Sequence, residues 1–306
     1  MTWPVIAGSQ TENRPSGFFD YGPLGKDEEM ADYKVIDWAV NQLNTQHSKP
    51  LFLAVGIFRP HIPWFVPERY FDLYPLDDVR LPEIKDNDLE DVSEIALAWV
   101  RREWQDWMLA NEQWGKAIQA YCASVSFADA QLGRLLKGLK KSGRSENTII
   151  ILWSDHGMHI GEKEQWEKFT LWEESTRVPL IVKVPGLTPG KGGVCREAVS
   201  LLDIFPTLVD LTGGSSFPQL EGIPLTPMLR NPETSRVEPA ISTFHFNNHS
   251  IRTERWRYIK YCNGDEELYD HNNDPDEFYN LAKMPDYRSI MDELAYWLPK
   301  VNYIEE

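Results

Sequence analysis

The sequence predicts an α/β protein with a mostly parallel central sheet flanked by helices, a smaller C-terminal antiparallel sheet and a terminal helix. Three apolar runs have the length and composition of buried strands, at 51–57, 148–153 and 178–184. Segments with helical spacing of apolar residues alternate with these runs, and short alternating runs follow from about residue 237. These patterns indicate a core sheet followed by a meander.

Helices are expected where apolar residues recur every three to four positions, which occurs at 31–46 and 116–141. A third helix is expected over 200–211. There, Ser200 is followed three residues later by Asp203, a pattern typical of a capping box at a helix N-terminus.

The C-terminal region is expected to form an antiparallel meander closed by a helix at 287–298. Its four strands are expected at 240–244, 249–252, 256–261 and 267–269. Asn263 and Gly264, between the last two strands, form a typical hairpin turn sequence. We therefore predict an α/β domain at 1–235 and a C-terminal α+β subdomain at 236–306.

The composition excludes two classes of protein. The chain has 306 residues, 42% of them hydrophobic, and no apolar run approaches the roughly 20 residues of a membrane span. Its formal net charge of −16 argues against nucleic acid as a partner, because nucleic-acid phosphates require a basic surface. An anionic small ligand would therefore need a local cationic pocket.

The segment 67–115 is irregular and rich in tryptophan. Long irregular segments on a rigid scaffold often form the walls of binding sites. Two interpretations of its central part, 78–114, stay open: a loop anchored on the core by its aromatic side chains, or a lid over a substrate.

A carboxylate and an imidazole lie together where the run 148–153 ends. Asp155 and His156 follow Ser154, and Gly157 then allows a sharp change of direction. Ligands of open α/β sheets bind beyond the carboxyl ends of strands, so the pair indicates a metal or anion site. The alternative is a helix cap with a surface histidine.

Four basic side chains are candidates for the cationic pocket: Arg59, His61, Lys163 and Lys168. Pro60 and Pro63 restrict the backbone around His61, although a histidine among apolar residues is commonly structural. Lys163 has an alternative role in a salt bridge with Glu164 or Glu167.

Five segments resemble one family in order along the chain: PLFLAVGIFRPHIPW at 50–64, YCASVSFADAQLGRLL at 121–136, SDHG to VPG at 154–186, RTERWRYIKY at 252–261 and ELYDHNNDPDEFYNL at 267–281. They resemble the sulfatase family of the alkaline-phosphatase superfamily, within it the branch of choline sulfatases and iduronate-2-sulfatase. The resemblance covers nearly all of the chain, which makes it more specific than any single short motif. It implies an alkaline-phosphatase-like fold that is incomplete at its N-terminus.

The resemblance also implies roles for individual residues. Asp155 and His156 match metal-binding positions, with Ca²⁺ or another divalent cation as the expected ion. His61 and Lys168 match catalytic positions: the histidine contacts the sulfate or protonates the leaving-group oxygen, and the lysine binds a sulfate oxygen. Three further residues are expected to contact the substrate: Arg59, Lys163 and His249. For His249 a surface histidine is an equally good description.

One family motif is absent from the sequence. Sulfatases carry Cys-x-Pro/Ala-x-Arg, whose cysteine is converted to the formylglycine nucleophile, but Cys122, Cys195 and Cys262 all lack this context. The tandem aspartates and the Lys-x-x-His segment that precede the matched region in the family are also missing. We therefore expect a truncated sulfatase that lacks turnover as given and exposes an incomplete sheet edge.

The predicted function is hydrolysis of a sulfate ester, of a sulfated carbohydrate or of choline sulfate, by a protein whose nucleophile lies outside this chain. One alternative is an inactive homologue that binds sulfated glycans, and another is a phosphodiesterase or phosphonate hydrolase of the same superfamily. The first residues of the sequence are not expected to form a signal peptide, and a periplasmic or secreted location is expected if a signal lies in the missing segment.

Overall fold

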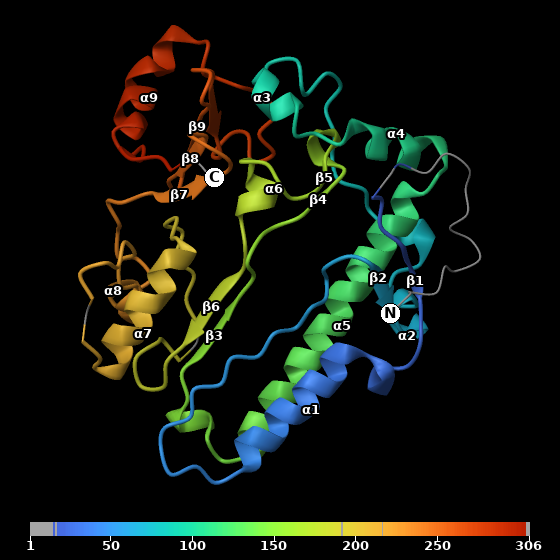
Figure 1. The fold of residues 1–306 in the computed structure, drawn as a ribbon, viewed down its shortest axis with the longest axis vertical. Helices are drawn as coiled ribbons and strands as arrows, with labels where there is room; N and C mark the ends of the chain where they lie inside the picture. The colour runs from blue at the N-terminus through green and yellow to red at the C-terminus, as the bar shows by residue number, and fades with distance from the viewer. Residues whose placement is uncertain (1–14, 16, 191, 216, 304–306) are drawn as a thin grey trace. The chain divides into compact units, whose positions relative to one another are not determined.

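The computed structural model describes residues 15, 17–190, 192–215 and 217–303 (Figure 1). The chain forms two compact units, here called unit 1 (Met1–Glu83 and Arg101–Thr148) and unit 2 (Ile84–Val100 and Ile149–Glu306). Helices and strands occur in both units, which agrees with the predicted α/β class. The predicted boundary between 235 and 236 does not coincide with these units and stays a prediction.

In unit 1 the elements are β1 (Tyr21–Pro23), η1 (Asp27–Glu29), α1 (Ala31–Asn44), β2 (Trp64–Val66), α2 (Glu68–Phe71), η2 (Leu76–Asp78), α4 (Arg102–Ala110), α5 (Trp114–Lys141) and η3 (Ser145–Asn147). The predicted helices at 31–46 and 116–141 are confirmed as α1 and α5, which lie side by side in Figure 1. Val40 of α1 packs so closely on Gly138 of α5 that a Cβ at Gly138 would lie 2.7 Å from the Val40 side chain. Strand β1 pairs in parallel with β2.

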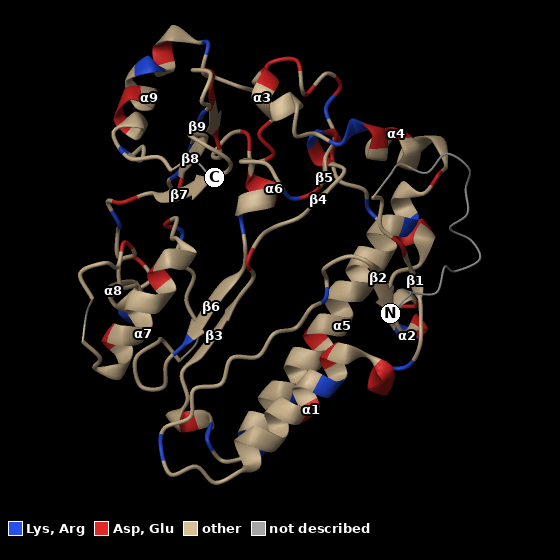
Figure 2. Ribbon diagram, viewed as in Figure 1, with Lys and Arg blue, Asp and Glu red and all other residues tan. Residues whose placement is uncertain are grey.

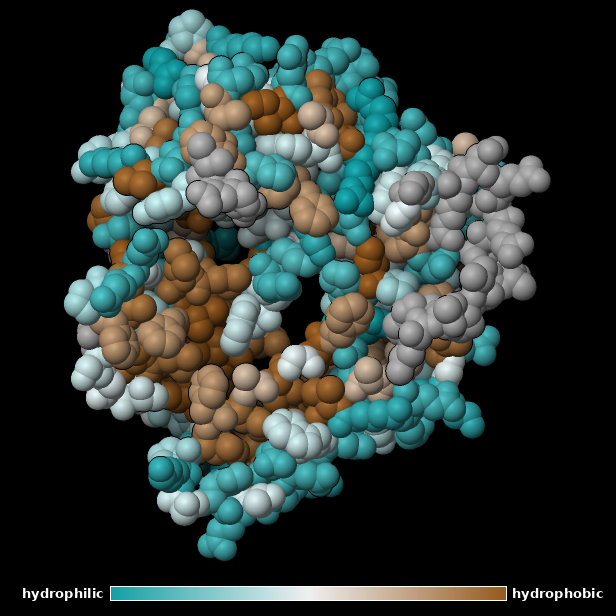
Figure 3. All heavy atoms as spheres, viewed as in Figure 1, coloured by the Kyte–Doolittle hydropathy of each residue, from teal (hydrophilic) through white to brown (hydrophobic). Residues whose placement is uncertain are grey.

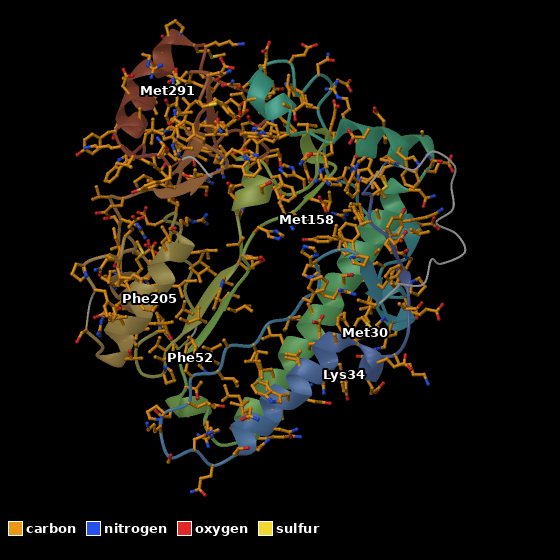
Figure 4. All side chains as sticks on the ribbon, viewed as in Figure 1. Met30, Lys34, Phe52, Met158, Phe205 and Met291 are labelled. Atoms are coloured by element: carbon orange, nitrogen blue, oxygen red, sulfur yellow. The ribbon has the colours of Figure 1, made fainter. Side chains whose placement is uncertain are left out.

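The predicted strand at 51–57 is wrong for this structure. No strand is assigned there, and the side chain of Phe52, labelled in Figure 4, is 80% exposed. A β-branched apolar run becomes a strand only when a neighbour completes its hydrogen-bond ladder. The described residues pair no strand with 51–57.

In unit 2 the elements are α3 (Glu94–Leu97), β3 (Ile150–Trp153), β4 (His159–Ile160), η4 (Glu162–Glu164), β5 (Trp166–Glu167), α6 (Glu173–Thr176), β6 (Leu180–Lys183), η5 (Leu201–Asp203), α7 (Ile204–Thr212), α8 (Thr226–Arg230), β7 (Ala240–Thr243), β8 (His249–Arg252), β9 (Trp256–Lys260), β10 (Glu266–Asp270), η6 (Pro285–Tyr287) and α9 (Arg288–Ala295). The predicted helix at 200–211 is therefore divided into η5 and α7. The capping box of Ser200 and Asp203 is confirmed, with the Ser200 amide donating to the Asp203 carboxylate at 2.8 Å.

Strands β3 and β6 correct the expectation of a doubly buried parallel pair. They pair antiparallel, with Trp153 opposite Leu180, because the connection between them contains a hairpin and the four-residue α6 instead of a crossover helix. Trp153 is 48% and Ile181 60% exposed. Figure 3 shows hydrophobic residues gathered over β3, β6 and α7, and Phe205 of α7 is labelled in Figure 4. In the described part of the chain this sheet has two strands, which agrees with the expected open edge.

The C-terminal meander is confirmed as an antiparallel sheet in the order β10-β9-β8-β7. Gly264 adopts a φ of 95° in the turn between β9 and β10, a conformation that favours glycine. Helix α9 packs on the sheet through Met291 and Leu294, which join a buried cluster with Ile251 and Tyr258. Figure 4 labels Met291.

The tryptophan-rich segment is packed within both units. In unit 1, Trp104 is 2% exposed and lies against Phe18, with ring centroids 4.9 Å apart. In unit 2, Leu89 and Ala96 belong to a buried cluster with Trp172. This favours the interpretation of an aromatic-anchored segment. Among the described helices, none combines the length and hydrophobicity that crossing a bilayer requires.

Candidate functional site

Asp155 and His156 form a tight turn directly after β3. The Ser154 hydroxyl donates to the His156 carbonyl at 3.0 Å, and His156 Nδ1 lies 2.7 Å from the Gly157 carbonyl. Because a carbonyl only accepts, Nδ1 carries the proton, and Nε2 bears the lone pair of the neutral ring. Nε2 lies 3.7 Å from Asp155 Oδ2, and the Asp155 side chain is 83% exposed. The turn thus offers one oxygen and one nitrogen ligand to a divalent cation.

Gly157 ties this turn to α6. Its amide donates to the Ser175 carbonyl at 2.9 Å. A Cβ at this position would lie 2.0 Å from the Glu174 carbonyl oxygen, so only glycine allows the two segments to approach this closely. The position of the Asp155–His156 turn therefore depends on the position of α6.

The hairpin of β4 and β5 returns the chain from His156 to Lys168. His159 pairs with Glu167, so Met158 directly precedes the first paired residue of β4 and Lys168 directly follows the last paired residue of β5. Lys168 thereby lies at the same end of the hairpin as the Asp155–His156 turn. Figure 2 shows acidic and basic positions next to each other around β5.

His159 forms the buried centre of this loop. Its Nε2 lies 3.0 Å from the Thr170 hydroxyl, which is in turn 2.7 Å from the Ser175 hydroxyl. Burial lowers the pKa of His159 to about 3, so the ring is neutral at physiological pH. A neutral histidine that links both sides of the loop serves to hold its shape.

A buried ion-pair network anchors α6 to the C-terminal sheet. Arg257 of β9 is 1% exposed and donates to the carboxylates of Glu173 and Glu277. It also donates to the Leu171 carbonyl at 3.0 Å. Burial alone would raise the pKa of Glu173, but the charges of Arg257 and Arg252 outweigh burial and lower that pKa to about 2. Glu173 is therefore ionised whenever the protein is folded at ordinary pH.

Three ligand-type side chains of this network could also be considered for a metal: Glu173, His271 and Glu277 each offer an atom within 4.8 Å of the others. His271 Nε2 lies 2.9 Å from Glu277 Oε1. Both carboxylates already accept hydrogen bonds from Arg257, and a cation would have to displace that guanidinium. The arrangement fits ion pairing. Sequence reasoning missed this group, because strand alternation in WRYIK gives no sign that an arginine lies inside.

The basic residues predicted to contact the substrate are buried in this structure. Lys163 has a 3% exposed side chain, donates to the Glu277 carbonyl and lies 3.4 Å from Asp88. His249 is 2% exposed, with its Nε2 2.8 Å from Asn302 and its pKa lowered by burial. Their substrate roles stay predictions that this arrangement does not favour.

Arg59 and His61 lie in unit 1. Arg59 is 5% exposed, donates to the Phe65 carbonyl at 3.3 Å, and has a pKa lowered by burial, so its predicted substrate contact is likewise not favoured. His61 is half-buried, with Nδ1 2.7 Å from the Ile62 carbonyl and its ring 4.9 Å from that of Phe58. Nδ1 thus carries a proton, and Nε2 is the nitrogen that can exchange one with a ligand.

Comparison with known proteins identifies the class first by its fold. The phosphonate monoester hydrolase of Agrobacterium radiobacter matches with a TM-score of 0.74 and 26% identity over 92% of this chain and 63% of that one. A structure solved in complex with its substrate D-glucosamine-2-N,6-O-disulfate matches with a TM-score of 0.68 and 22% identity, over 88% of this chain and 68% of that one. The fold is therefore the α/β fold of the alkaline-phosphatase superfamily.

The sequence then defines the family. The family profile described as Sulfatase matches residues 3–215, and that described as N-sulphoglucosamine sulphohydrolase, C-terminal, matches residues 161–303. The chain belongs to the sulfatase family, which confirms the resemblance.

Curated relatives agree with this assignment. A sulfatase of Formosa agariphila is 39% identical over 287 residues, covering 92% of this chain and 56% of that protein. The choline-sulfatase of Rhizobium meliloti is 32% identical over 247 residues, covering 78% of this chain and 47% of that protein. The chain spans about half the length of the curated relatives it matches.

Proposed function

We propose that this chain supplies the cation- and sulfate-binding part of a sulfuric ester hydrolase that acts on sulfated saccharides or small sulfate esters. The main support is the sulfatase family membership, together with the Asp155–His156 turn at the carboxyl end of β3 and Lys168 at the same end of the following hairpin. No cysteine of the chain has the formylglycine context. We expect the nucleophile to come from outside these 306 residues.

The residues have distinct tasks in this proposal. Lys168 would provide a point charge for a sulfate oxygen. The role of His61, proton transfer to the leaving-group oxygen, is carried over from the family resemblance alone. Asp155 would hold a divalent cation, with His156 as a ligand or near-ligand through Nε2. The cation, Ca²⁺ by the family resemblance, would neutralise the sulfate oxygens when bound.

The test uses the protein translated from the whole reading frame that contains this chain. It should hydrolyse 4-nitrophenyl sulfate, lose turnover in EDTA and regain it with Ca²⁺. Absence of turnover, with sulfate binding intact and no Cys-x-Pro-x-Arg upstream, would instead establish the inactive homologue that binds sulfated glycans.

A second candidate is a phosphonate or phosphodiester hydrolase. It is favoured by the TM-score of 0.74 with a phosphonate monoester hydrolase. Both groups of enzymes bind a tetrahedral oxyanion, so the site geometry alone suits either substrate. The kcat/KM values for 4-nitrophenyl sulfate, a phosphate diester and a phosphonate monoester decide between them, and a clear preference for either phosphorus ester would reject the sulfatase proposal.

A further inference from the structure

Four rings form a continuous group next to Lys168 within unit 2. This group, here called the aromatic platform, consists of Trp99, Phe169, Phe244 and His245. The ring centroids of Phe169 and Phe244 are 6.0 Å apart, and those of Phe244 and His245 are 4.1 Å apart. The rings of Trp99 and Phe244 meet edge to face, with their centroids 4.9 Å apart. Lys168 Nζ lies 5.6 Å from the Phe169 ring centroid, so a positive charge borders the platform.

The outer rings of the platform are held in unfavourable backbone conformations. Phe169 has a φ of 76° and His245 a φ of 55°, which place both in the left-handed region. Such a conformation costs on the order of 1–3 kcal/mol for a bulky residue such as Phe169, and less for a histidine, which adopts it more readily. Backbone strain of this kind persists only where the surrounding structure imposes it.

Buried amide side chains impose these conformations. Gln165, 0% exposed, donates to the Lys168 carbonyl at 2.9 Å and so fixes the turn that presents Phe169. Asn248, 2% exposed, donates to the carbonyls of Phe244 and Phe246 and accepts from the Cys262 amide at 2.9 Å. The two turns are thus built independently, and both present a ring at the surface.

Two rings of the platform face the surface, while Trp99 and Phe244 are partly buried and pack against the cluster that contains Leu171 and Tyr261. Phe169 is 41% exposed and His245 is exposed as well, although burial of such rings would be favourable. A rigid aromatic surface with a neighbouring fixed charge suits a ligand that has an apolar face and an anionic group. The CH face of a sugar ring stacks on aromatic rings, and a sulfate substituent would meet Lys168.

We infer that the aromatic platform binds the sugar ring of a sulfated saccharide whose sulfate group contacts Lys168. This inference rests on the proposed function and names its substrate class. A quaternary ammonium ester such as choline sulfate also favours aromatic rings, but the ammonium of Lys168 already lies over the Phe169 ring and would repel a second cation there.

The test compares His245→Gly with Asn247→Gly. Glycine accepts the left-handed backbone at both positions, where φ is 55° and 57°, so both variants keep the turn and one of them removes a ring. For the wild-type protein and both variants, dissociation constants are measured by calorimetry with inorganic sulfate, N-acetylglucosamine 6-sulfate and choline sulfate.

The quantity compared is the ratio of the affinity for the sulfated sugar to the affinity for inorganic sulfate. This ratio should fall five- to tenfold in His245→Gly, an effect of roughly 1 kcal/mol, and should stay unchanged in Asn247→Gly. An unchanged ratio in His245→Gly overturns the inference, as does a larger loss for choline sulfate than for the sugar. If the wild-type protein hydrolyses sulfate esters while the ratio stays unchanged, the inference alone fails. If it neither binds nor hydrolyses any sulfated compound, the proposed function fails with it.

Discussion

The guanidinium of Arg257 and the carboxylate of Glu173 form a buried ion pair that joins β9 to the first residue of α6. Because α6 also accepts the Gly157 amide, this pair connects the C-terminal sheet to the turn that carries Asp155. The sheet at the end of the chain therefore supports the candidate site, although its strands lie about 100 residues away in sequence.

Replacing Arg257 with Met should be strongly destabilising, by about 3 to 5 kcal/mol, because two buried carboxylates lose their main counter-charge. The free energy of unfolding is measured in urea. The matched control is Arg177→Met: the Arg177 side chain is 78% exposed and lies 3.7 Å from the same Glu173, so its removal should leave the midpoint nearly unchanged. Equal midpoints for the two variants would contradict the role of the network.

Gly157→Ala should displace the Asp155–His156 turn, because the added Cβ meets the Glu174 carbonyl at 2.0 Å. A loss of about 1 to 3 kcal/mol is expected. The matched control is Gly133→Ala in the middle of α5, where nothing lies within 4 Å of the added Cβ and a gain of about 0.5 to 1 kcal/mol is expected. Thermal unfolding gives the sign of the stability change for each variant. A Gly157→Ala variant that is more stable than wild type would refute the close packing of the turn on α6.

Glu174 should make stability fall as pH rises. Burial, followed by the charges of Glu162 and Glu173, raises its pKa to about 7 from an ordinary value of 4.5. Between these two pH values the folded protein binds a proton that the unfolded chain has lost, so stability declines through this window. The free energy of unfolding of Glu174→Gln relative to that of wild type should therefore be about 1 to 3 kcal/mol more favourable at pH 8 than at pH 5. A pH-independent difference would exclude this titration.

Lys163→Met should reduce stability and leave sulfate affinity nearly unchanged, because the ammonium group is occupied by Asp88 and the Glu277 carbonyl. A loss of about 3 kcal/mol is expected, since Asp88 stays buried without its partner. Urea unfolding and sulfate titration are both needed. A large loss of sulfate affinity in a stable variant would restore the substrate role predicted from the sequence.

Local patterns predicted the local elements well. Helices α1 and α5 and the strands β7 to β10 follow from periodicity and turn sequences, because these elements depend on neighbours close in the chain. The partners of the apolar runs at 51–57 and 148–153 could not be predicted, since strand pairing is set by distant segments.

The candidate site was predicted in part. The position of Asp155 and His156 after a strand follows from sequence order alone. The burial of Lys163 depends on Asp88 and Glu277, 75 and 114 residues away, and no local signal distinguishes it from Lys168. The supporting residues Arg257 and His159 were missed for the same reason.

The most direct test of the account measures kcat/KM for 4-nitrophenyl sulfate in the protein translated from the whole reading frame, with Lys168→Ala and His61→Ala compared with Lys183→Ala on the exposed side of β6. Both site variants should lose activity by about 100-fold or more while their unfolding midpoints stay near that of wild type, and the control should retain activity. Near-normal turnover in both site variants would contradict the account.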